Sequence, residues 1–273
     1  MKYAICNETF GDWPLRKALD LAVQSGYTGW EIAPFMLCGS LSAYTSSQRD
    51  AYRKEVEAAG LSVVGLHWLL AKTQGLHLTS PDSQTRERTT AYLIELARLC
   101  HDLGGNVMVL GSPQQRNYGD DQTGAEAMAM AADVLSGVVE TLVQCDVRIA
   151  LEPLGPQEGN FLNTAAEARE LAGMIGSDAI QLHLDVKAMS SEAEPIDAVI
   201  RDNGDAMIHF HANDPNRQGP GMGDVDFVPI FQALKDVGYD GWVSVEVFDY
   251  SPGVETLVGQ SMSNMRKAEQ SVH

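Results

Sequence analysis

The sequence predicts a (β/α)8 TIM barrel, an α/β fold in which a single domain spans residues 1–273. Two observations support this prediction. Apolar strand-like runs alternate with helix-like stretches along the whole chain, which is typical of parallel β-α-β winding. Four of the runs also end in a polar residue, namely Glu152, Asp185, His211 and Glu246, and one helix-like stretch separates each from the next. Barrels of this class collect their chemistry at the carboxyl ends of the strands.

The predicted strands are apolar runs bounded by turn residues, and the predicted helices are amphipathic stretches between them. The strands are expected at 2–7, 27–33, 61–68, 105–111, 147–152, 179–185, 206–211 and 241–247. The helices are expected at 13–25, 45–59, 84–103, 123–144, 164–175, 193–203, 227–237 and 254–268. Eight strand-helix units complete one turn of the barrel.

Capping residues mark several of these boundaries. Asp12 and Thr164 precede helical stretches, where a side-chain oxygen can accept from free backbone N–H groups. Gly26, Gly60 and Gly238 stand between a helix and the next strand, where a left-handed residue ends the helix. These glycines lie at the amino-terminal face of the barrel, so the opposite face is predicted to carry the chemistry.

Composition restricts the partners and the location. Hydrophobic residues make up 44% of the chain and the formal net charge is −18. This charge, without a Lys/Arg-rich run, argues against nucleic acids and anionic membranes and favours a small sugar or polar metabolite. The chain shows no secretory signal and no apolar window of about 18 residues, which predicts a cytoplasmic protein. Its four cysteines form no CxxC pair and are predicted to be reduced.

The polar strand ends predict a metal site. Each residue alone is more often solvated or hydrogen-bonded than metal-bound, but three carboxylates and one imidazole at four successive strand ends form an oxygen-rich ligand set. Such a set suits Mn²⁺, Mg²⁺ or Co²⁺ better than Zn²⁺. Four earlier strands also end in rim residues, which are Glu8, Glu31, His67 and Gly111. So many carboxylates at one rim are costly without a cation.

Glu152 and Glu246 are predicted to act in a second way. Their strands are separated by two others, so the two carboxylates would face each other across the barrel mouth. One could remove a proton from a carbon next to a carbonyl while the other returns a proton to the opposite face, and the metal would hold the enediolate oxygens. His183 and His209 lie one layer deeper and are predicted to be hydrogen-bonded residues of the barrel core rather than ligands.

The segments LEPLGPQEGNFLNT, HLDVKAMSSE, HFHANDPNRQGPGMGDVDF and WVSVEVFDYSPG resemble the xylose isomerase-like TIM-barrel superfamily. That group includes ketose 3-epimerases, inosose isomerases and dehydratases, hydroxypyruvate isomerases and endonuclease IV. The resemblance implies that Glu152, Asp185, His211 and Glu246 bind one divalent ion, with Mn²⁺ favoured, and that the two glutamates are the acid/base pair. Barrels of this group often dimerise or tetramerise, so it also implies a homo-oligomer.

The resemblance extends to two substrate contacts. In the ketose 3-epimerases a glutamate six residues after the first metal-binding glutamate and an arginine six residues after the metal-binding histidine contact the substrate. Glu158 and Arg217 occupy these positions. Alternatively, Glu158 and Arg217 pair with each other or with loop backbone.

The chain departs from the family pattern at Ala188, where relatives carry a histidine three residues after the metal-binding aspartate. This departure argues against nuclease activity and for a substrate other than a free ketohexose. Lys187 stands beside it and is predicted either to contact a substrate oxyanion or to lie on the surface. His67 and Trp68 end the third strand. They are predicted to bind a sugar hydroxyl and to stack on a sugar face, or else to pack in the core.

The leading hypothesis is a metal-dependent sugar or keto-polyol isomerase or epimerase. A dehydratase or lyase acting on a keto-inositol or 3-keto-sugar would use the same metal site and the same enediolate, as would a hydroxypyruvate isomerase-like enzyme acting on a keto acid. A sugar-binding barrel without turnover is the alternative outside enzymes.

Overall fold

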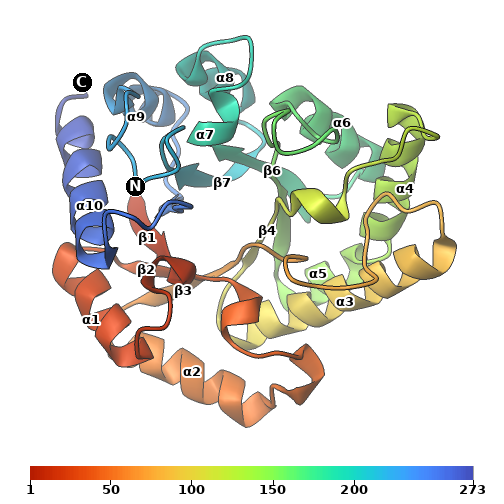
Figure 1. Ribbon diagram of the computed structural model, residues 1–273, viewed down its shortest axis with the longest axis horizontal. Coiled ribbons are helices and arrows are strands. Elements are labelled where there is room, and N and C mark those ends of the chain that lie inside the picture. Colours follow the sequence, from red (N-terminus) through yellow and green to blue (C-terminus); the bar gives the residue numbers. More distant parts are fainter. Residues whose placement is uncertain (273) are drawn as a thin grey trace.

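The computed structural model describes residues 1–272 and confirms the barrel (Figure 1). Within these residues eight parallel strands follow one another in chain order, and β8 pairs with β1 to close the sheet. The strands are β1 (Lys2–Cys6), β2 (Gly29–Ile32), β3 (Ser62–Leu66), β4 (Val107–Leu110), β5 (Arg148–Leu151), β6 (Ile180–Asp185), β7 (Met207–Ala212) and β8 (Trp242–Val245). Each predicted strand is present, with ends within two residues of the prediction.

Helices surround the barrel (Figure 1). They are α1 (Leu15–Ser25), α2 (Ser46–Ala58), α3 (Ser83–Asp102), α4 (Gly124–Ser136), α5 (Val139–Cys145), α6 (Ala165–Ile175), α7 (Val186–Met189), α8 (Ile196–Asn203), α9 (Phe227–Asp236) and α10 (Val254–Gln270). Short 3-10 turns are η1 (Asn7–Phe10), η2 (Pro34–Met36), η3 (Leu41–Ala43) and η4 (Pro113–Gln115).

Two helices differ from the prediction. The stretch 123–144 divides into α4 and α5, which are bent by 41° at a break that contains Gly137. A Cβ at Gly137 would lie 2.8 Å from the Thr90 Cγ2 atom, so glycine allows the chain to pass close to α3. The unpredicted α7 begins directly after β6, because the Asp185 side chain accepts a hydrogen bond of 2.8 Å from the Ala188 N–H.

The capping predictions are largely confirmed. The Thr164 side chain accepts from the Glu167 N–H at 3.2 Å. Gly26, Gly60 and Gly238 all have positive φ, at 99°, 93° and 68°. Asp12 is not a cap, because α1 begins only at Leu15, after Pro14.

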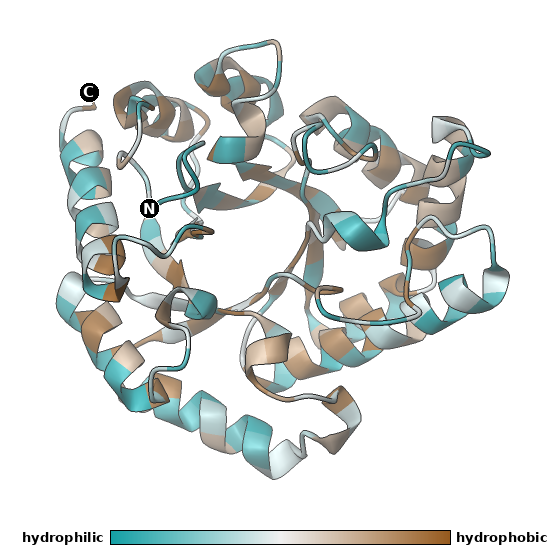
Figure 2. Ribbon diagram, in the orientation of Figure 1, coloured by the Kyte–Doolittle hydropathy of each residue, from teal (hydrophilic) through white to brown (hydrophobic). Residues whose placement is uncertain are grey.

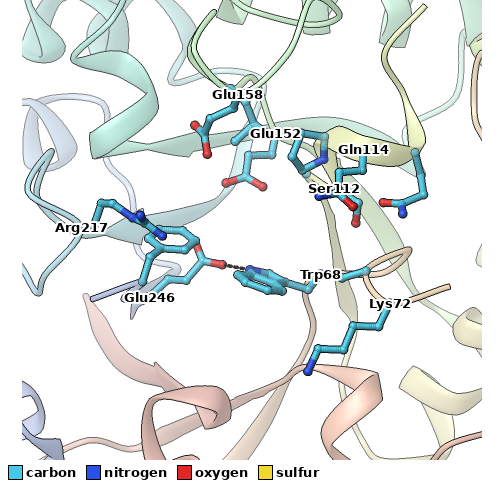
Figure 3. Close-up of a pocket in the computed structure, with 14 residues that line it drawn as sticks. Trp68, Lys72, Ser112, Gln114, Glu152, Glu158, Arg217 and Glu246 are labelled. Atoms are coloured by element: carbon cyan, nitrogen blue, oxygen red, sulfur yellow. Dashed lines mark hydrogen bonds between the residues drawn. The ribbon is translucent and has the colours of Figure 1, made fainter. Parts of the chain in front are cut away.

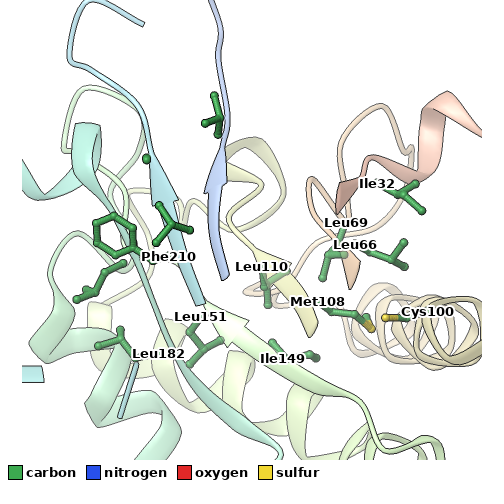
Figure 4. Close-up of a cluster of buried hydrophobic side chains, with 14 of the residues drawn as sticks. Ile32, Leu66, Leu69, Cys100, Met108, Leu110, Ile149, Leu151, Leu182 and Phe210 are labelled. Atoms are coloured by element: carbon green, nitrogen blue, oxygen red, sulfur yellow. The ribbon is translucent and has the colours of Figure 1, made fainter. Parts of the chain in front are cut away.

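The main apolar core lies between the strands and the helices. Large side chains from the outer face of the strands, among them Met108, Leu151 and Phe210, pack beneath the helices (Figure 4). Figure 2 shows that the helices carry mixed apolar and polar surfaces.

Within residues 1–272 no single helix is long and apolar enough to cross a membrane, and only the bent pair α4 and α5 passes that test together. This pair packs against α3 and α6.

The inside of the barrel changes from apolar to polar towards the carboxyl ends of the strands. Val107, Val109 and Ala150 form a small apolar cluster at one end. Further along the strands, alternation of side chains brings His183 and His209 to the buried interior. Branched apolar residues usually fill such a barrel, so this polar interior marks the region beneath the predicted site.

Candidate active site

The four predicted metal ligands lie at the carboxyl ends of four neighbouring strands. Glu152 directly follows β5, Asp185 ends β6, His211 belongs to β7 and Glu246 directly follows β8. All four side chains are buried. The strand positions that the sequence predicts therefore do bring these residues to one end of the barrel.

The four side chains also form one cluster. Ligand atoms of Glu152, Asp185, His211 and His183 lie within 4.8 Å of one another. Glu246 joins them through His211, whose Nδ1 atom lies 3.1 Å from the Glu246 Oε2 atom. The cluster presents the carboxylate oxygens and imidazole nitrogen that divalent ions bind.

The charges in this cluster favour a cation. Burial raises the pKa of Glu152 well above its usual range, and the nearby charges of Glu246 and Asp185 raise it further. Burial also raises the pKa of Asp185. For Glu246 burial acts in the same direction, but the charge and hydrogen bond of His211 outweigh it and the pKa is lowered. Three buried carboxylates beside one imidazole therefore fit a divalent metal ion, which would balance their charge.

Two neighbours orient the candidate ligands. Asn213 donates from its Nδ2 atom to the Asp185 Oδ2 atom at 2.5 Å. The His211 Nε2 atom lies 3.0 Å from the Glu31 Oε1 atom, which leaves Nδ1 facing the cluster. The sequence places Glu31 at a strand end. It does not identify Glu31 or Asn213 as a partner of a metal ligand, because the sequence pattern does not show which side chains will be hydrogen-bonded to each other.

A pocket of about 420 Å³ lies at this end of the barrel (Figure 3). Glu152 and Glu246 both line it and point into the same space. Its other lining residues are Trp68, Ala71, Lys72, Gly111, Ser112, Pro113, Gln114, Gln115, Leu154, Glu158, Arg217 and Phe248. Most of these belong to loops, where no strand or helix period predicts which side chains turn inward.

Three predicted substrate-binding residues line this pocket, namely Glu158, Arg217 and Trp68. The Trp68 Nε1 atom donates to the Glu246 Oε1 atom at 2.5 Å, and its ring stacks on Phe248 with centroids 5.9 Å apart. Trp68 is therefore in contact with a candidate catalytic carboxylate, a role that the sequence does not indicate.

Lys187 is not a surface residue. Its relative exposure is 8%, and its Nζ atom lies 2.6 Å from the Glu158 Oε2 atom and 4.9 Å from the centroid of the Phe248 ring. The partner of Glu158 is thus Lys187 rather than Arg217. Because Glu158 lines the pocket, this ion pair brings the Lys187 ammonium group close to the pocket.

His67 lies below the pocket, in agreement with the alternative prediction of a core residue. It is fully buried, it is absent from the pocket lining, and its Nε2 atom lies 2.8 Å from the Glu8 Oε2 atom. His67 and Glu8 are both buried, and Trp68, the residue after His67, reaches the pocket instead.

The two deeper histidines behave differently. His209 is hydrogen-bonded as predicted, with its Nε2 atom 2.8 Å from the Glu31 Oε2 atom. For His183 the prediction of a hydrogen bond is wrong, because neither ring nitrogen has a partner within residues 1–272. Its Nε2 atom lies 3.9 Å from the Glu152 Oε1 atom, directly beside the candidate metal ligands.

A closed parallel barrel with buried carboxylates and an imidazole beneath a pocket at its carboxyl end defines a class of TIM-barrel enzymes. The comparison of families agrees with this class. Residues 19–268 match the family described as xylose isomerase-like TIM barrel, and the chain belongs to this family.

Several proteins similar to this chain are named as sugar epimerases. D-psicose 3-epimerase from Enterocloster bolteae is 29% identical over 260 residues, which cover 91% of this chain and 82% of that protein. L-ribulose 3-epimerase from Mesorhizobium japonicum is 30% identical over 171 residues, or 63% of this chain and 58% of that protein. The solved structure of D-psicose 3-epimerase with D-tagatose from Clostridium cellulolyticum H10 shares the fold, with a TM-score of 0.87, 21% identity, and coverage of 98% of this chain and 99% of that one. These similarities support a sugar epimerase.

Proposed function

We propose that the protein is a divalent-metal-dependent sugar or keto-polyol epimerase or isomerase that moves a proton next to a carbonyl group. One observation carries this proposal. Glu152 and Glu246 point into one pocket from β5 and β8, within a buried cluster that also contains Asp185 and His211. Two carboxylates on either side of one bound substrate can act as acid and base on its two faces.

The four clustered residues would hold the metal ion, and Mn²⁺ is the ion that we propose, with Mg²⁺, Co²⁺ and Zn²⁺ as alternatives. When bound, a divalent ion supplies a Lewis acid that makes a carbon-bound proton next to a carbonyl easier to remove. The oxygen-rich donor set supports this choice over a site selective for zinc.

The protein's own groups perform the proton transfer. One glutamate takes the carbon-bound proton, the electron pair of that bond becomes the carbon–carbon double bond of an enediolate, and the π pair of the carbonyl moves onto its oxygen. The other glutamate gives a proton to the opposite face, where the pair of the carbon–carbon double bond forms the new C–H bond and the carbonyl re-forms, which inverts the carbon centre. Glu158 and Arg217 line the pocket and Lys187 pairs with Glu158, which supports a role for them in orienting hydroxyl and carbonyl oxygens of the substrate.

A second candidate is elimination from a keto-inositol or 3-keto-sugar. The observation that favours it is Ala188, because the missing histidine removes a contact expected for a free ketohexose, and the buried Lys187 stands beside it. In that reaction the same carboxylate removes the proton, and the electron pair expels a leaving group from the neighbouring carbon. An unsaturated ketone would then absorb in the ultraviolet.

Proton NMR in D2O tests the proposal. The Mg²⁺-loaded protein, which is diamagnetic, is incubated with a panel of ketoses, keto-inositols and keto acids. We expect loss of one carbon-bound proton signal with the wild type and a rate lower by about 10²–10⁴ with Glu246→Gln or Glu152→Gln.

Exchange at the wild-type rate in both variants would refute the assigned acid/base pair. Tight sugar binding without any exchange would instead favour the non-enzymatic, sugar-binding barrel. A cytoplasmic location, a single domain over residues 1–273 and a homo-oligomeric state remain predictions, the last to be checked by light scattering.

A further inference from the structure

We propose that Trp68 is a positioning residue for Glu246, and that its indole N–H holds the carboxylate oxygen that exchanges the substrate proton. The inference rests on the proposed function, which makes Glu246 an acid/base. It adds a specific task for a side chain that the sequence predicts either to stack on a sugar face or to pack in the core.

The two oxygens of Glu246 have different partners. Oε2 lies 3.1 Å from the His211 Nδ1 atom, on the side of the candidate metal ligands. Oε1 accepts the indole hydrogen bond of Trp68 at 2.5 Å and lies towards the pocket (Figure 3). The geometry therefore assigns Oε1 to the substrate and holds the carboxylate between the Trp68 indole and the His211 imidazole.

Aromatic neighbours fix the indole. Its ring stacks on Phe248 at a centroid distance of 5.9 Å and an interplanar angle of 19°, and Phe35 lies 5.8 Å away at 49°. Two residues further along, the Leu70 N–H donates to the Ser112 hydroxyl at 3.0 Å in a buried contact. The loop after β3 is thus tied to the loop after β4, and the indole has little freedom to turn away.

The backbone of Trp68 is strained at the same place. Its φ is 53°, in the left-handed region that disfavours a residue with a bulky side chain. Five non-glycine residues within residues 1–272 have positive φ, and three of them, Trp68, Lys72 and Arg217, line the pocket. Such strain persists where the surrounding structure enforces it, and it gathers at functional sites.

The hydrogen bond should affect the chemical step more than binding. With one lone pair of Oε1 engaged by the indole, the other remains directed into the pocket for the proton of the substrate. Without the N–H the Glu246 carboxylate can rotate about its last side-chain bond. A small displacement of a base lowers the rate of the chemical step. We therefore expect an effect on kcat with little effect on KM.

Trp68→Phe distinguishes the contribution of the indole N–H from that of the aromatic ring, because phenylalanine lacks the N–H but keeps an aromatic side chain between Phe35 and Phe248. On the substrate found by the exchange experiment, kcat should fall about 10- to 100-fold, while KM and Mn²⁺ affinity change less than about threefold. The primary isotope effect with substrate deuterated at the reacting carbon should rise, because proton transfer becomes slower than the other steps. Trp13→Phe, the same change on a residue outside this pocket, should leave all of these values unchanged.

Unchanged kcat in Trp68→Phe would overturn the inference, and so would a loss confined to KM, which would make the indole a stacking surface only. If Trp68→Phe does not fold, NMR of the folded wild type replaces it. The protein has four tryptophans, so selective labelling with ¹⁵N-indole resolves one N–H signal for each.

One indole signal should shift and exchange faster with water in Glu246→Ala while the other three stay in place, whether or not a substrate has been found. Four unmoved signals would reject the hydrogen bond itself. Absence of turnover in the wild type, with the Glu246-dependent shift present, would count against the proposed function and not against the contact.

Discussion

Glu31 lies one layer below the candidate metal ligands and contacts two imidazoles. Its Oε1 atom is 3.0 Å from the His211 Nε2 atom, and its Oε2 atom is 2.8 Å from the His209 Nε2 atom. Burial raises the pKa of Glu31, but the two imidazoles outweigh burial and lower it well below its usual range. An ionised carboxylate here would keep the proton of His211 on Nε2 and leave Nδ1 free for a metal ion.

Glu31→Gln should therefore weaken Mn²⁺ binding. Glutamine keeps the size of the side chain but cannot accept from both imidazoles with full charge, so the ring of His211 loses its fixed orientation. We expect an affinity lower by about 10- to 100-fold, measured by titration calorimetry of the metal-free protein.

Glu57→Gln provides the matched control, because Glu57 is exposed and pairs with Arg53, four residues away on α2. That variant should bind Mn²⁺ like the wild type. Wild-type affinity in Glu31→Gln would show that His211 is oriented by other contacts.

At the scale of the elements, the strands are the most predictable part of the chain. Segments such as IALE and QLHLD end in polar residues, and the alternation of a strand takes those residues inside the barrel. The cluster of Glu152, Asp185, His211 and Glu246 follows from strand ends alone. The segments between the strands and the long helices are different. Lys72 reaches the pocket from a loop and Gln114 from η4, and Lys187 on the short α7 pairs with Glu158. None of these short segments has a periodic pattern that predicts the position of its side chains.

The helix boundaries show a similar limit. Local composition predicts one helix over 123–144, whereas the close approach of Gly137 to Thr90 on α3 divides it. The short α7 depends on Asp185 serving as a cap, which is a consequence of where β6 ends. In each case a tertiary contact decides what the local pattern leaves open.

The end of β4 offers a prediction about space. Gly111 follows this strand, and a Cβ atom added to it would overlap the carboxylate of Glu152. Its backbone has no positive φ, so the glycine is needed for room rather than for conformation. Gly111→Ala should displace the Glu152 carboxylate and reduce both Mn²⁺ affinity and the exchange rate at least about tenfold.

Gly173→Ala on α6 is the corresponding control, because nothing lies within 4 Å of an added Cβ atom there. It should leave metal binding unchanged and stabilise the helix by about 1 kcal/mol. Normal Mn²⁺ affinity in Gly111→Ala would mean that Glu152 moves aside at no cost to the site.

On the scale of the whole molecule, the negative charges of the surface carboxylates are better compensated than those of the carboxylates inside the barrel. The formal net charge is −18, and surface carboxylates have water and ion pairs such as Arg169–Asp205 around them. Inside the barrel, Glu8, Glu31, Glu152, Asp185 and Glu246 are all buried. His67 and His209 lie close to Glu8 and Glu31. Of the three carboxylates nearest the pocket, Glu246 lies within hydrogen-bonding distance of the His211 imidazole, whereas Asp185 accepts from the uncharged amide of Asn213. The metal-free fold therefore carries an electrostatic cost at its centre.

Metal binding should therefore stabilise the whole barrel as well as complete its site. A ligand that binds only the folded state at about a hundred times its Kd adds about 2.7 kcal/mol. For a chain of this size that corresponds to a rise in Tm of roughly 5–10 °C. Calorimetry of the EDTA-treated protein before and after addition of Mn²⁺ measures the rise, and Asp185→Asn, which removes one candidate ligand charge, should show a smaller one. An equal rise in wild type and Asp185→Asn would place the stabilising ion elsewhere in the molecule, because the cost that the ion relieves is concentrated where these carboxylates meet.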